Sequence, residues 1–143
     1  MISPAGLRLI RLFESFSPTL YRDMAGLWTV GWGHLVKPGE VFDLPLSPEN
    51  GEIVLLRDVS VAERAISRLI RVPLNQNMFD SLTSWTFNLG SGALQASMLR
   101  QVINRGDLDE APAQIRRWVY AGGRKLKGLI RRREVEARLF ACG

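Results

Sequence analysis

Two acidic residues and a threonine lie close together near the N-terminus, at Glu14, Asp23 and Thr29. One carboxylic acid can protonate a leaving oxygen while a second carboxylate directs water or acts as a nucleophile, and a hydroxyl can hold the attacking water. Cleavage of a glycosidic bond needs this division of roles. An acid at a helix end and an Asp beside a turn are also compatible with solvated surface and local hydrogen bonds, so spacing alone leaves both interpretations open.

Glu14 is predicted to lie in the last turn of a helix. Ser3 and Pro4 are typical of an N-cap and a first helical position. Leu7, Ile10 and Glu14 are spaced by three and four residues, so they share one face of that helix. We therefore expect Glu14 in apolar surroundings, where desolvation disfavours the charged carboxylate and keeps the acid a proton donor.

A two-residue period predicts a β-hairpin over residues 20–34, with Asp23 beside its turn, where it is expected to be solvated and ionised. Alternation along the second strand places Thr29 on the same face as Gly31 and Gly33. The opposite, bulky face consists of Trp28, Val30, Trp32 and His34. Because glycine has no side chain, these two positions leave space beside the hydroxyl, and we expect a ligand or the backbone to approach closely there.

The rest of the chain is predicted to be helical. Ser47 and Pro48 begin a periodic segment that continues to about Arg71 and would span roughly 35 Å at about 1.5 Å per residue. Shorter helices are expected over residues 75–88, 97–104, 108–117 and 127–141, with a turn over 89–94.

The composition is that of a globular protein, with 46% hydrophobic and 23% charged residues in a chain of 143. No run approaches about 18 apolar residues, and Arg8 and Arg11 interrupt the N-terminal stretch before the core of a signal peptide could form. We therefore expect no membrane span. We also expect the protein to stay in the cytoplasm until something else releases it. Cys142 is the single cysteine, which excludes an intramolecular disulfide.

Positive charge gathers in the last part of the chain. Residues 1–110 hold 10 Lys/Arg and 12 Asp/Glu, whereas residues 111–143 hold 9 and 2, so their net charges are −2 and +7. Such a basic end favours an anionic membrane or an anionic cell-wall polymer as partner. Nucleic acid is not expected, because no helix-turn-helix or zinc-finger pattern accompanies the charge. Apolar residues at helical spacing predict a core-docked C-terminal helix with a basic outer face, and a membrane-disturbing helix is the alternative.

Residues 14–34 resemble the catalytic motif of the phage-type lysozymes, glycoside hydrolase family 24: a Glu, eight residues, an Asp, five residues, a Thr, then VGWGH. Residues 79–94, FDSLTSWTFNLGSGAL, resemble the central helix and turn of that family. Residues 116–140, RRWVYAGGRKLKGLIRRREVEARLF, resemble the closing segment of its cell-lysing endolysins. Together these segments cover nearly the whole chain in the family's order, and they are jointly specific, although the three-residue spacing alone is weak.

The resemblance implies a lysozyme-like α+β fold, mostly helical, with a sugar-binding cleft between two lobes. Its parts are a hairpin lobe over about 14–46, a connecting helix over about 47–72 and, together with the N-terminal helix, a helical lobe over about 73–143. It also implies a glycosidase that cleaves the β-1,4 bond between N-acetylmuramic acid and N-acetylglucosamine in peptidoglycan, without metal or cofactor, and so lyses bacteria. We expect a monomer that reaches the periplasm once a separate protein has permeabilised the inner membrane.

The resemblance further implies roles for single residues. Glu14 corresponds to the general acid, and Asp23 and Thr29 correspond to the groups that stabilise and position on the other side of the scissile bond. An arginine from residues 131–133 is implied to approach this acid. The register does not say which one, and a solvated basic helix face is the alternative for each of them.

Other positions match places that line the family's cleft, namely Leu35, Phe87 and Asn88. Asn88 is expected to hydrogen-bond an N-acetyl or hydroxyl group, or alternatively to cap the end of its helix. His34 resembles a histidine that pairs with an acid on the long helix, which is Asp58 in this chain. That pair is expected to be structural.

Two positions depart from the family's pattern. Ser15 stands where glycine commonly follows the catalytic Glu, and Trp32 replaces a smaller residue between two glycines, where we expect a packing change.

Three functions therefore stay open. They are a peptidoglycan hydrolase of the endolysin type, a non-catalytic muramidase-like module that binds the cell wall, for which Ser15 is the only hint, and a cationic membrane-active protein whose lysis does not depend on Glu14.

Overall fold

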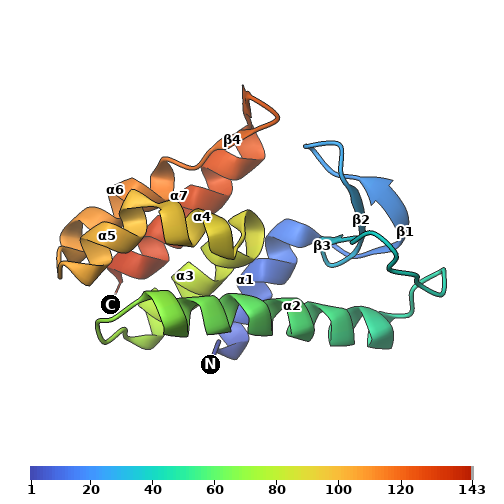
Figure 1. Ribbon diagram of the computed structural model, residues 1–143, viewed down its shortest axis with the longest axis horizontal. Helices are drawn as coiled ribbons and strands as arrows, with labels where there is room; N and C mark the ends of the chain where they lie inside the picture. Colours follow the sequence, from blue (N-terminus) through green and yellow to red (C-terminus); the bar gives the residue numbers. More distant parts are fainter. Residues whose placement is uncertain (143) are drawn as a thin grey trace.

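A long helix joins a small sheet to a group of shorter helices in the computed structural model, which describes residues 1–142 (Figure 1). The first elements are α1 (Pro4–Glu14), β1 (Ser17–Arg22), β2 (Trp28–Gly31), β3 (His34–Leu35) and α2 (Pro48–Leu69). They are followed by α3 (Gln76–Leu89), α4 (Ser91–Ala96), α5 (Met98–Asn104), the 3-10 turn η1 (Leu108–Glu110), α6 (Ala111–Arg116), β4 (Tyr120–Ala121), β5 (Arg124–Lys125) and α7 (Lys127–Ala141). The predicted fold class, α+β and mostly helical, is confirmed.

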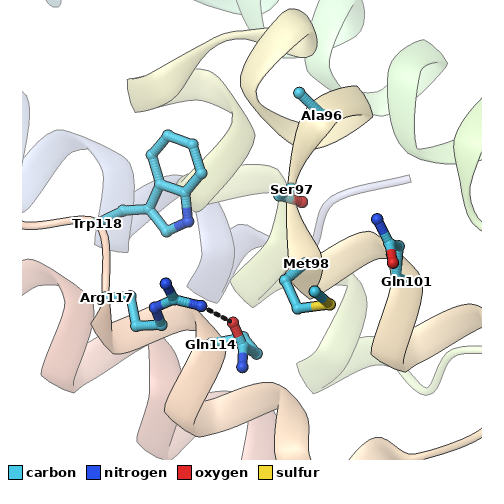
Figure 2. Close-up of a pocket in the computed structure, with 7 residues that line it drawn as sticks. All are labelled: Ala96, Ser97, Met98, Gln101, Gln114, Arg117 and Trp118. Carbon is cyan, nitrogen blue, oxygen red and sulfur yellow. Dashed lines mark hydrogen bonds between the residues drawn. The ribbon is translucent and has the colours of Figure 1, made fainter.

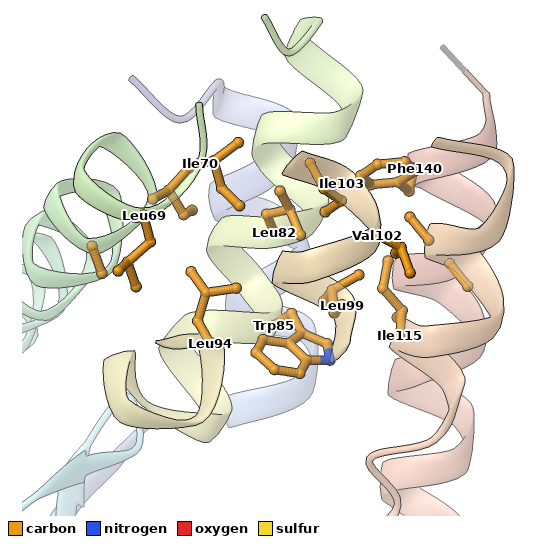
Figure 3. Close-up of a cluster of buried hydrophobic side chains, with 14 residues drawn as sticks. Leu69, Ile70, Leu82, Trp85, Leu94, Leu99, Val102, Ile103, Ile115 and Phe140 are labelled. Carbon is orange, nitrogen blue, oxygen red and sulfur yellow. The ribbon is translucent and has the colours of Figure 1, made fainter. Parts of the chain in front are cut away.

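Helix α3 is the centre of the core. It packs against α1, α2, α4 and α7, and its Trp85 is fully buried among apolar side chains (Figure 3). Labelled neighbours in this cluster are Leu69, Ile70, Leu82, Leu94, Leu99, Val102, Ile103, Ile115 and Phe140. A second, smaller cluster joins Ile10 of α1 to Leu55 and Val59 of α2. Burial of these apolar surfaces fixes α1, α3 and α7, the helices that carry the site, relative to one another.

Helix α2 begins where the sequence predicts, because the Ser47 hydroxyl accepts a hydrogen bond from the Asn50 N–H at 3.1 Å and caps the helix. It ends at Leu69, two residues before the predicted Arg71. The helix contacts β2 and β3 of the sheet as well as α3 and α4. Within residues 1–142, no helix has both the length and the apolar content that a membrane crossing needs. The division into lobes stays a prediction, and its last residue, Gly143, lies outside the described residues.

The sheet differs from the predicted hairpin in its second strand. The continuous strand expected up to His34 is broken, because Gly31 and Gly33 adopt φ angles of 65° and 71° and turn the chain back. Strand β3 then pairs antiparallel with β2, which pairs antiparallel with β1. The predicted alternation holds for Val30 and His34, which pair with each other and are buried, but the predicted burial is wrong at two positions. Thr29 is buried, whereas Trp28, expected on the buried face, is half exposed.

Two short elements were not predicted. Helix α4 lies where a turn was expected over 89–94, and the β4–β5 hairpin turns at Gly122 and Gly123, which have φ angles of 58° and 76°. Elements of two to six residues are too short for a hydrophobic period to be read. The longer predicted helices over 75–88 and 127–141 match α3 and α7 to within one residue at each end.

Candidate active site

Glu14 is the last residue of α1, and Ser15 ends this helix. The N–H of Ser15 donates to the carbonyl of Arg11 at 3.2 Å. Ser15 has a φ of 54°, and within residues 1–142 it is the only residue other than glycine at positive φ. A side chain in this sparsely populated conformation costs about 1–3 kcal/mol, so the backbone at this position favours glycine.

Replacing Ser15 by glycine is expected to raise the free energy of unfolding by about 1 kcal/mol, because glycine relieves the strain but loses more backbone entropy on folding. Urea unfolding of both proteins measures the difference. Ser17→Gly is the control, since Ser17 lies in β1 and its hydroxyl donates to the carbonyl of Thr19 at 2.8 Å. That change should lower the free energy of unfolding. A loss of stability in Ser15→Gly would show that the backbone is not strained there.

A buried arginine from α7 contacts Glu14. Nη1 of Arg132 donates to Oε2 of Glu14, and the two side chains are 3% and 14% exposed. Arg132 is therefore the member of residues 131–133 that approaches the acid, which the sequence left open. The expectation of purely apolar surroundings for Glu14 is wrong, because a guanidinium lies against its carboxyl group.

The space predicted beside Thr29, at Gly31 and Gly33, is filled by side chains of the protein. A Cβ atom at Gly33 would lie 2.2 Å from Oε1 of Glu14, and one at Gly31 would lie 3.1 Å from the side chain of Leu46. The two glycines thus admit these neighbours, so the close approach expected there is made by the protein's own side chains, and Gly33 also lines the pocket described below. As a result, the Glu14 carboxyl group is held between the sheet on one side and α7 on the other.

Asp23 makes the local hydrogen bonds that are usual for an Asp beside a turn. Its Oδ1 accepts from the N–H groups of Ala25 and Leu27, both at 2.9 Å. In the described part of the chain no donor bonds to Oδ2. One carboxylate oxygen therefore fixes the hairpin turn, and the other is left for a ligand or water.

Tyr21 links the three residues predicted to form the site. Burial raises the pKa of the Tyr21 phenol, and the negative charges of Glu14 and Asp23 raise it further. Tyr21 also pairs with Thr29 across β1 and β2. Thr29 is buried, and its hydroxyl donates to the carbonyl of Leu27 at 2.9 Å. Tyr21 was not predicted, although its place on the strand two residues before Asp23 was an available signal.

A network of buried charges lies behind Glu14. Oε2 of Glu136 accepts from the hydroxyl of Ser84 at 2.5 Å and from Nε of Arg132 at 3.2 Å. Oε1 of Glu136 lies 2.8 Å from Nε of Arg133, an ion pair whose angle does not make a hydrogen bond. The predicted basic outer face is thus wrong for Arg132 and Arg133, which are buried. The missed signal was Glu136, which follows these arginines at the helical spacing of four and three residues.

Leu35 and Phe87, both predicted to line a cleft, lie on the wall of one pocket of about 270 Å³ between β3 and the helices α2, α3 and α4. The other residues of this wall are Gly33, His34, Lys37, Asp58, Val61, Ala62, Thr86, Gly90 and Ser91. Asn88, the third predicted residue, is not part of the wall. Its side-chain oxygen accepts a hydrogen bond from Arg133 at 2.6 Å.

A second pocket, of about 330 Å³, is lined by residues of α4, α5 and α6 and the segments beside them (Figure 2). Figure 2 shows Trp118 on one side and Met98 and Gln101 on the other, with Arg117 donating to Gln114 at 3.0 Å. The polar groups on this wall are amides, a hydroxyl and a guanidinium, without a carboxylate. This pocket therefore lacks an acid and base of its own, and the candidate chemistry lies at Glu14.

His34 connects the sheet to α2, as the sequence predicts. Its Nδ1 lies 2.7 Å from Oδ2 of Asp58, and its Nε2 lies 2.9 Å from Oε1 of Glu40, a partner that was not predicted. The hydrogen bond with Asp58 raises the pKa of His34, and Glu40 adds to this, although burial opposes it. Burial also acts to raise the pKa of Glu40, but hydrogen bonds from the Lys37 N–H and from His34 lower it on balance.

The raised pKa of His34 predicts a loss of stability at high pH. The folded protein holds this proton more tightly than the unfolded chain, in which the pKa is about 6.5. The stabilisation is complete below about pH 6.5 and is lost as the pH rises through the raised pKa. We therefore expect the free energy of unfolding in urea to fall as the pH rises from about 6.5 through the raised pKa of His34. Asp58→Asn removes the hydrogen bond that contributes most to the raised pKa of His34, so the free energy of unfolding of this variant should fall less with pH. An equal fall in both proteins would assign the pH dependence to another group.

Comparison of the sequence with known proteins gives a consistent result. The model of the family described as phage lysozyme matches residues 11–136. The endolysin of Bacillus phage B103 is 35% identical over 147 residues, which cover 99% of this chain and 54% of that protein, so the chain spans about half the length of this relative. The endolysin of Acyrthosiphon pisum secondary endosymbiont phage 1 is 36% identical over 145 residues, which cover 97% of each chain.

Comparison of the fold agrees with the sequence. The solved muramidase domain of SpmX from Asticaccaulis excentricus matches with a TM-score of 0.85 and 32% identity, over 98% of this chain and 97% of that one. The family match covers most of the chain, including the Glu14 group, the pocket of Leu35 and Phe87 and most of α7. The chain therefore belongs to the phage lysozyme family of peptidoglycan-hydrolysing glycosidases.

Proposed function

We propose that this protein is a muramidase of the endolysin type, which hydrolyses the β-1,4 bond between N-acetylmuramic acid and N-acetylglucosamine and so lyses bacteria. The observation that carries the proposal is the largely buried carboxyl group of Glu14, which Arg132 binds at one oxygen and Gly33 adjoins at the other, with Asp23 in the turn of the adjoining hairpin. Two carboxylates with different partners are the groups that hydrolysis of a glycosidic bond uses. Membership of the phage lysozyme family supports the same reaction.

Glu14 is proposed to donate the proton to the leaving oxygen. Its Oε2 is bound by Arg132 and its Oε1 faces Gly33, so the orientation of the carboxyl group is fixed before substrate arrives. We assign the donated proton to Oε1, because Oε2 is engaged with the guanidinium. Asp23, with Oδ1 bound in the hairpin turn, offers Oδ2 to stabilise positive charge at the sugar carbon or to direct water.

Thr29 is proposed to orient the attacking water. Its hydroxyl hydrogen is used by the carbonyl of Leu27, so its oxygen can only accept a further hydrogen bond. A water molecule that donates to this oxygen keeps its own lone pairs free for attack on the sugar. No metal ion or cofactor takes part in this scheme.

The substrate is proposed to lie along the pocket beside β3. Leu35 and Phe87 provide apolar surface for the sugar rings, and Asn88, next to Phe87 at the end of α3, provides polar contact. His34 and Asp58 hold β3 on α2 and keep this wall in place. Peptidoglycan strands are therefore the partner that we assign to the cleft.

The basic surface is proposed to bring the enzyme to the wall. Seven of the nine basic residues after position 110 are exposed, namely Arg116, Arg117, Arg124, Lys125, Lys127, Arg131 and Arg138. They attract an anionic cell wall or membrane surface over a range that salt shortens. We propose a monomer that is held in the host cytoplasm and acts in the periplasm after the inner membrane has been permeabilised.

Incubation of purified peptidoglycan with the wild-type protein and with Glu14→Gln, followed by mass spectrometry, tests the proposal. We expect fragments with reducing ends from the wild type and not from the variant. Anhydro ends would instead indicate a lytic transglycosylase. Sedimentation of the wild type with peptidoglycan without fragments would indicate a binding module. Leakage of anionic vesicles at equal rates with both proteins, again without fragments, would indicate a membrane-active protein.

A further inference from the structure

Two turns from distant parts of the chain lie against each other. The turn between β1 and β2 is formed by residues 23–27, and the turn between β4 and β5 contains Gly122 and Gly123. A Cβ atom at Gly122 would lie 4.0 Å from the carbonyl oxygen of Met24. Both turns are on the side of the molecule that faces away from α2 (Figure 1). We call this region, residues 22–28 and 120–127, the turn surface.

The turn surface exposes large apolar and aromatic side chains. Met24, Leu27 and Trp28 of the first hairpin are 76%, 51% and 49% exposed. Tyr120, on the strand before the second turn, is 62% exposed. Single exposed apolar residues are ordinary, but a group of them on two adjoining turns is typical of an interaction site.

The same surface is positively charged. Three exposed cations lie on or beside the second turn, namely Arg124, Lys125 and Lys127. Within residues 1–142 none of the three forms an ion pair. On the first hairpin the guanidinium of Arg22 lies 4.5 Å from the centre of the Trp28 ring. Asp23 is the single acid of the turn surface, so four cations and one acid give a net charge of +3.

We infer that the turn surface docks on an anionic lipid bilayer. Apolar side chains are buried where headgroups meet acyl chains, aromatic rings favour the same depth, and cations attract anionic headgroups. An anionic cell-wall polymer would neutralise the cations but offers no apolar phase to Met24 and Leu27. The combination of charge and exposed apolar side chains therefore favours lipid as the partner.

Docking through this surface also covers Asp23, which directly precedes Met24 in the first turn. This step rests on the proposed function, in which Asp23 acts beside the sugar carbon. The bilayer and the glycan strand then exclude one another. The lipid-bound protein is inactive towards peptidoglycan until it leaves the bilayer.

Sedimentation with vesicles of equal parts phosphatidylcholine and phosphatidylglycerol measures the docking. Met24→Ser/Tyr120→Ser should weaken binding at least about tenfold, the effect expected when one large apolar side chain is withdrawn from lipid. Lys125→Gln/Lys127→Gln should weaken binding about fivefold for each cation removed. A wild-type protein that binds vesicles of phosphatidylcholine alone equally well, or that binds neither kind, would overturn the inference.

Two controls match these variants elsewhere on the protein. Val41→Ser removes an exposed apolar side chain from the loop between β3 and α2. Arg57→Gln/Arg68→Gln removes two exposed cations from α2. Both controls should bind the vesicles like the wild type. Losses equal to those of the turn variants would assign the binding to net charge or general hydrophobicity and would overturn the inference.

Other occupants of the turn surface give different results with Met24→Ser/Tyr120→Ser. Weaker sedimentation of this variant with purified peptidoglycan, by the same factor as with vesicles, would assign the surface to the cell wall. Conversion of a wild-type dimer into a monomer, measured by analytical ultracentrifugation, would assign it to a second copy of the chain. Either result would overturn the inference.

A fluorescent label reports whether the first turn enters lipid. Cys142 is exposed and is the single cysteine, so Cys142→Ser/Met24→Cys can be labelled at one position with an environment-sensitive dye. Its emission should shift to shorter wavelength on the anionic vesicles, whereas the same dye in Cys142→Ser/Val41→Cys should not respond. An unchanged emission at position 24 would show that the turn does not enter the bilayer.

Peptidoglycan cleavage in the presence of vesicles separates the inference from the proposed function. Anionic vesicles should slow the release of reducing ends by the wild type in proportion to the fraction of protein bound, and should slow Met24→Ser/Tyr120→Ser less. Full release by vesicle-bound protein would overturn the covering of Asp23. A protein that docks as expected but releases no fragments without vesicles contradicts the proposed function and supports the docking. A protein that cleaves peptidoglycan but does not sediment with anionic vesicles contradicts the docking alone.

Discussion

Replacement of Glu14 by glutamine is expected to slow the release of fragments from peptidoglycan by about 10²- to 10⁴-fold, the usual contribution of a general acid. The amide cannot protonate the leaving oxygen, although it keeps the shape of the side chain. Its carbonyl oxygen can still accept the hydrogen bond that Nη1 of Arg132 donates to Glu14. Arg132 also keeps its contact with Glu136 at 3.2 Å, so the variant should fold normally.

Glu52→Gln is the matched control for this experiment. Glu52 pairs with Arg11 between α2 and α1 and is 40% exposed, so the same chemical change is made in an ion pair outside the proposed site. Reducing ends released per unit time measure both variants, and thermal unfolding checks their folding. Release of reducing ends by Glu14→Gln at the wild-type rate would rule out Glu14 as the general acid. Equal losses in both variants would point to general damage and not to chemistry.

The place of Glu14 could be predicted from the sequence, because local rules decide it. The cap at Ser3, the proline at position 4 and the spacing from Leu7 to Glu14 define a helix and one of its faces. The surroundings of Glu14 could not be predicted in the same way. Its partner, Arg132, lies 118 residues later, and only the docking of α7 on α3 determines which of three adjacent arginines points inward.

The end of the second strand of the sheet is another feature that could not be predicted from the sequence. Alternation indicates which residues form strands, but it does not indicate where a strand turns back. Gly31 and Gly33 use the positive φ angles that glycine permits, so the strand ends earlier than the pattern predicts and Thr29 is buried. The place of Tyr21 opposite Thr29 likewise depends on the pairing of β1 with β2. Long periodic helices such as α2, α3 and α7 were predicted well because they contain many turns of one pattern.

Replacement of Glu136 by glutamine is expected to lower the free energy of unfolding by about 3–5 kcal/mol, the usual cost of removing one partner from a buried ion pair. The Glu136 carboxylate is fully buried and is shared by the guanidinium groups of Arg132 and Arg133. Burial lowers the pKa of Arg133, and the charge of Glu136 opposes this effect. Glutamine keeps the volume of the side chain but not its charge, so in the described part of the chain Arg133 would lose the one carboxylate that it pairs with.

Glu134→Gln is the matched control, because Glu134 lies on the same helix and pairs at the surface with Arg116 at 2.8 Å and with Arg138 at 2.9 Å. Solvated pairs contribute little, so this variant should unfold in urea close to wild type. Adding Arg133→Met to Glu136→Gln should recover part of the loss, since it removes the guanidinium left without a partner. Similar losses in the two glutamine variants, or a double variant whose loss is the sum of the single ones, would show that buried charge balance does not hold α7 on α3. A larger loss in Glu136→Gln, partly recovered in the double variant, would show that α7 is stabilised by Glu136. This is the same carboxylate that binds Arg132 beside Glu14.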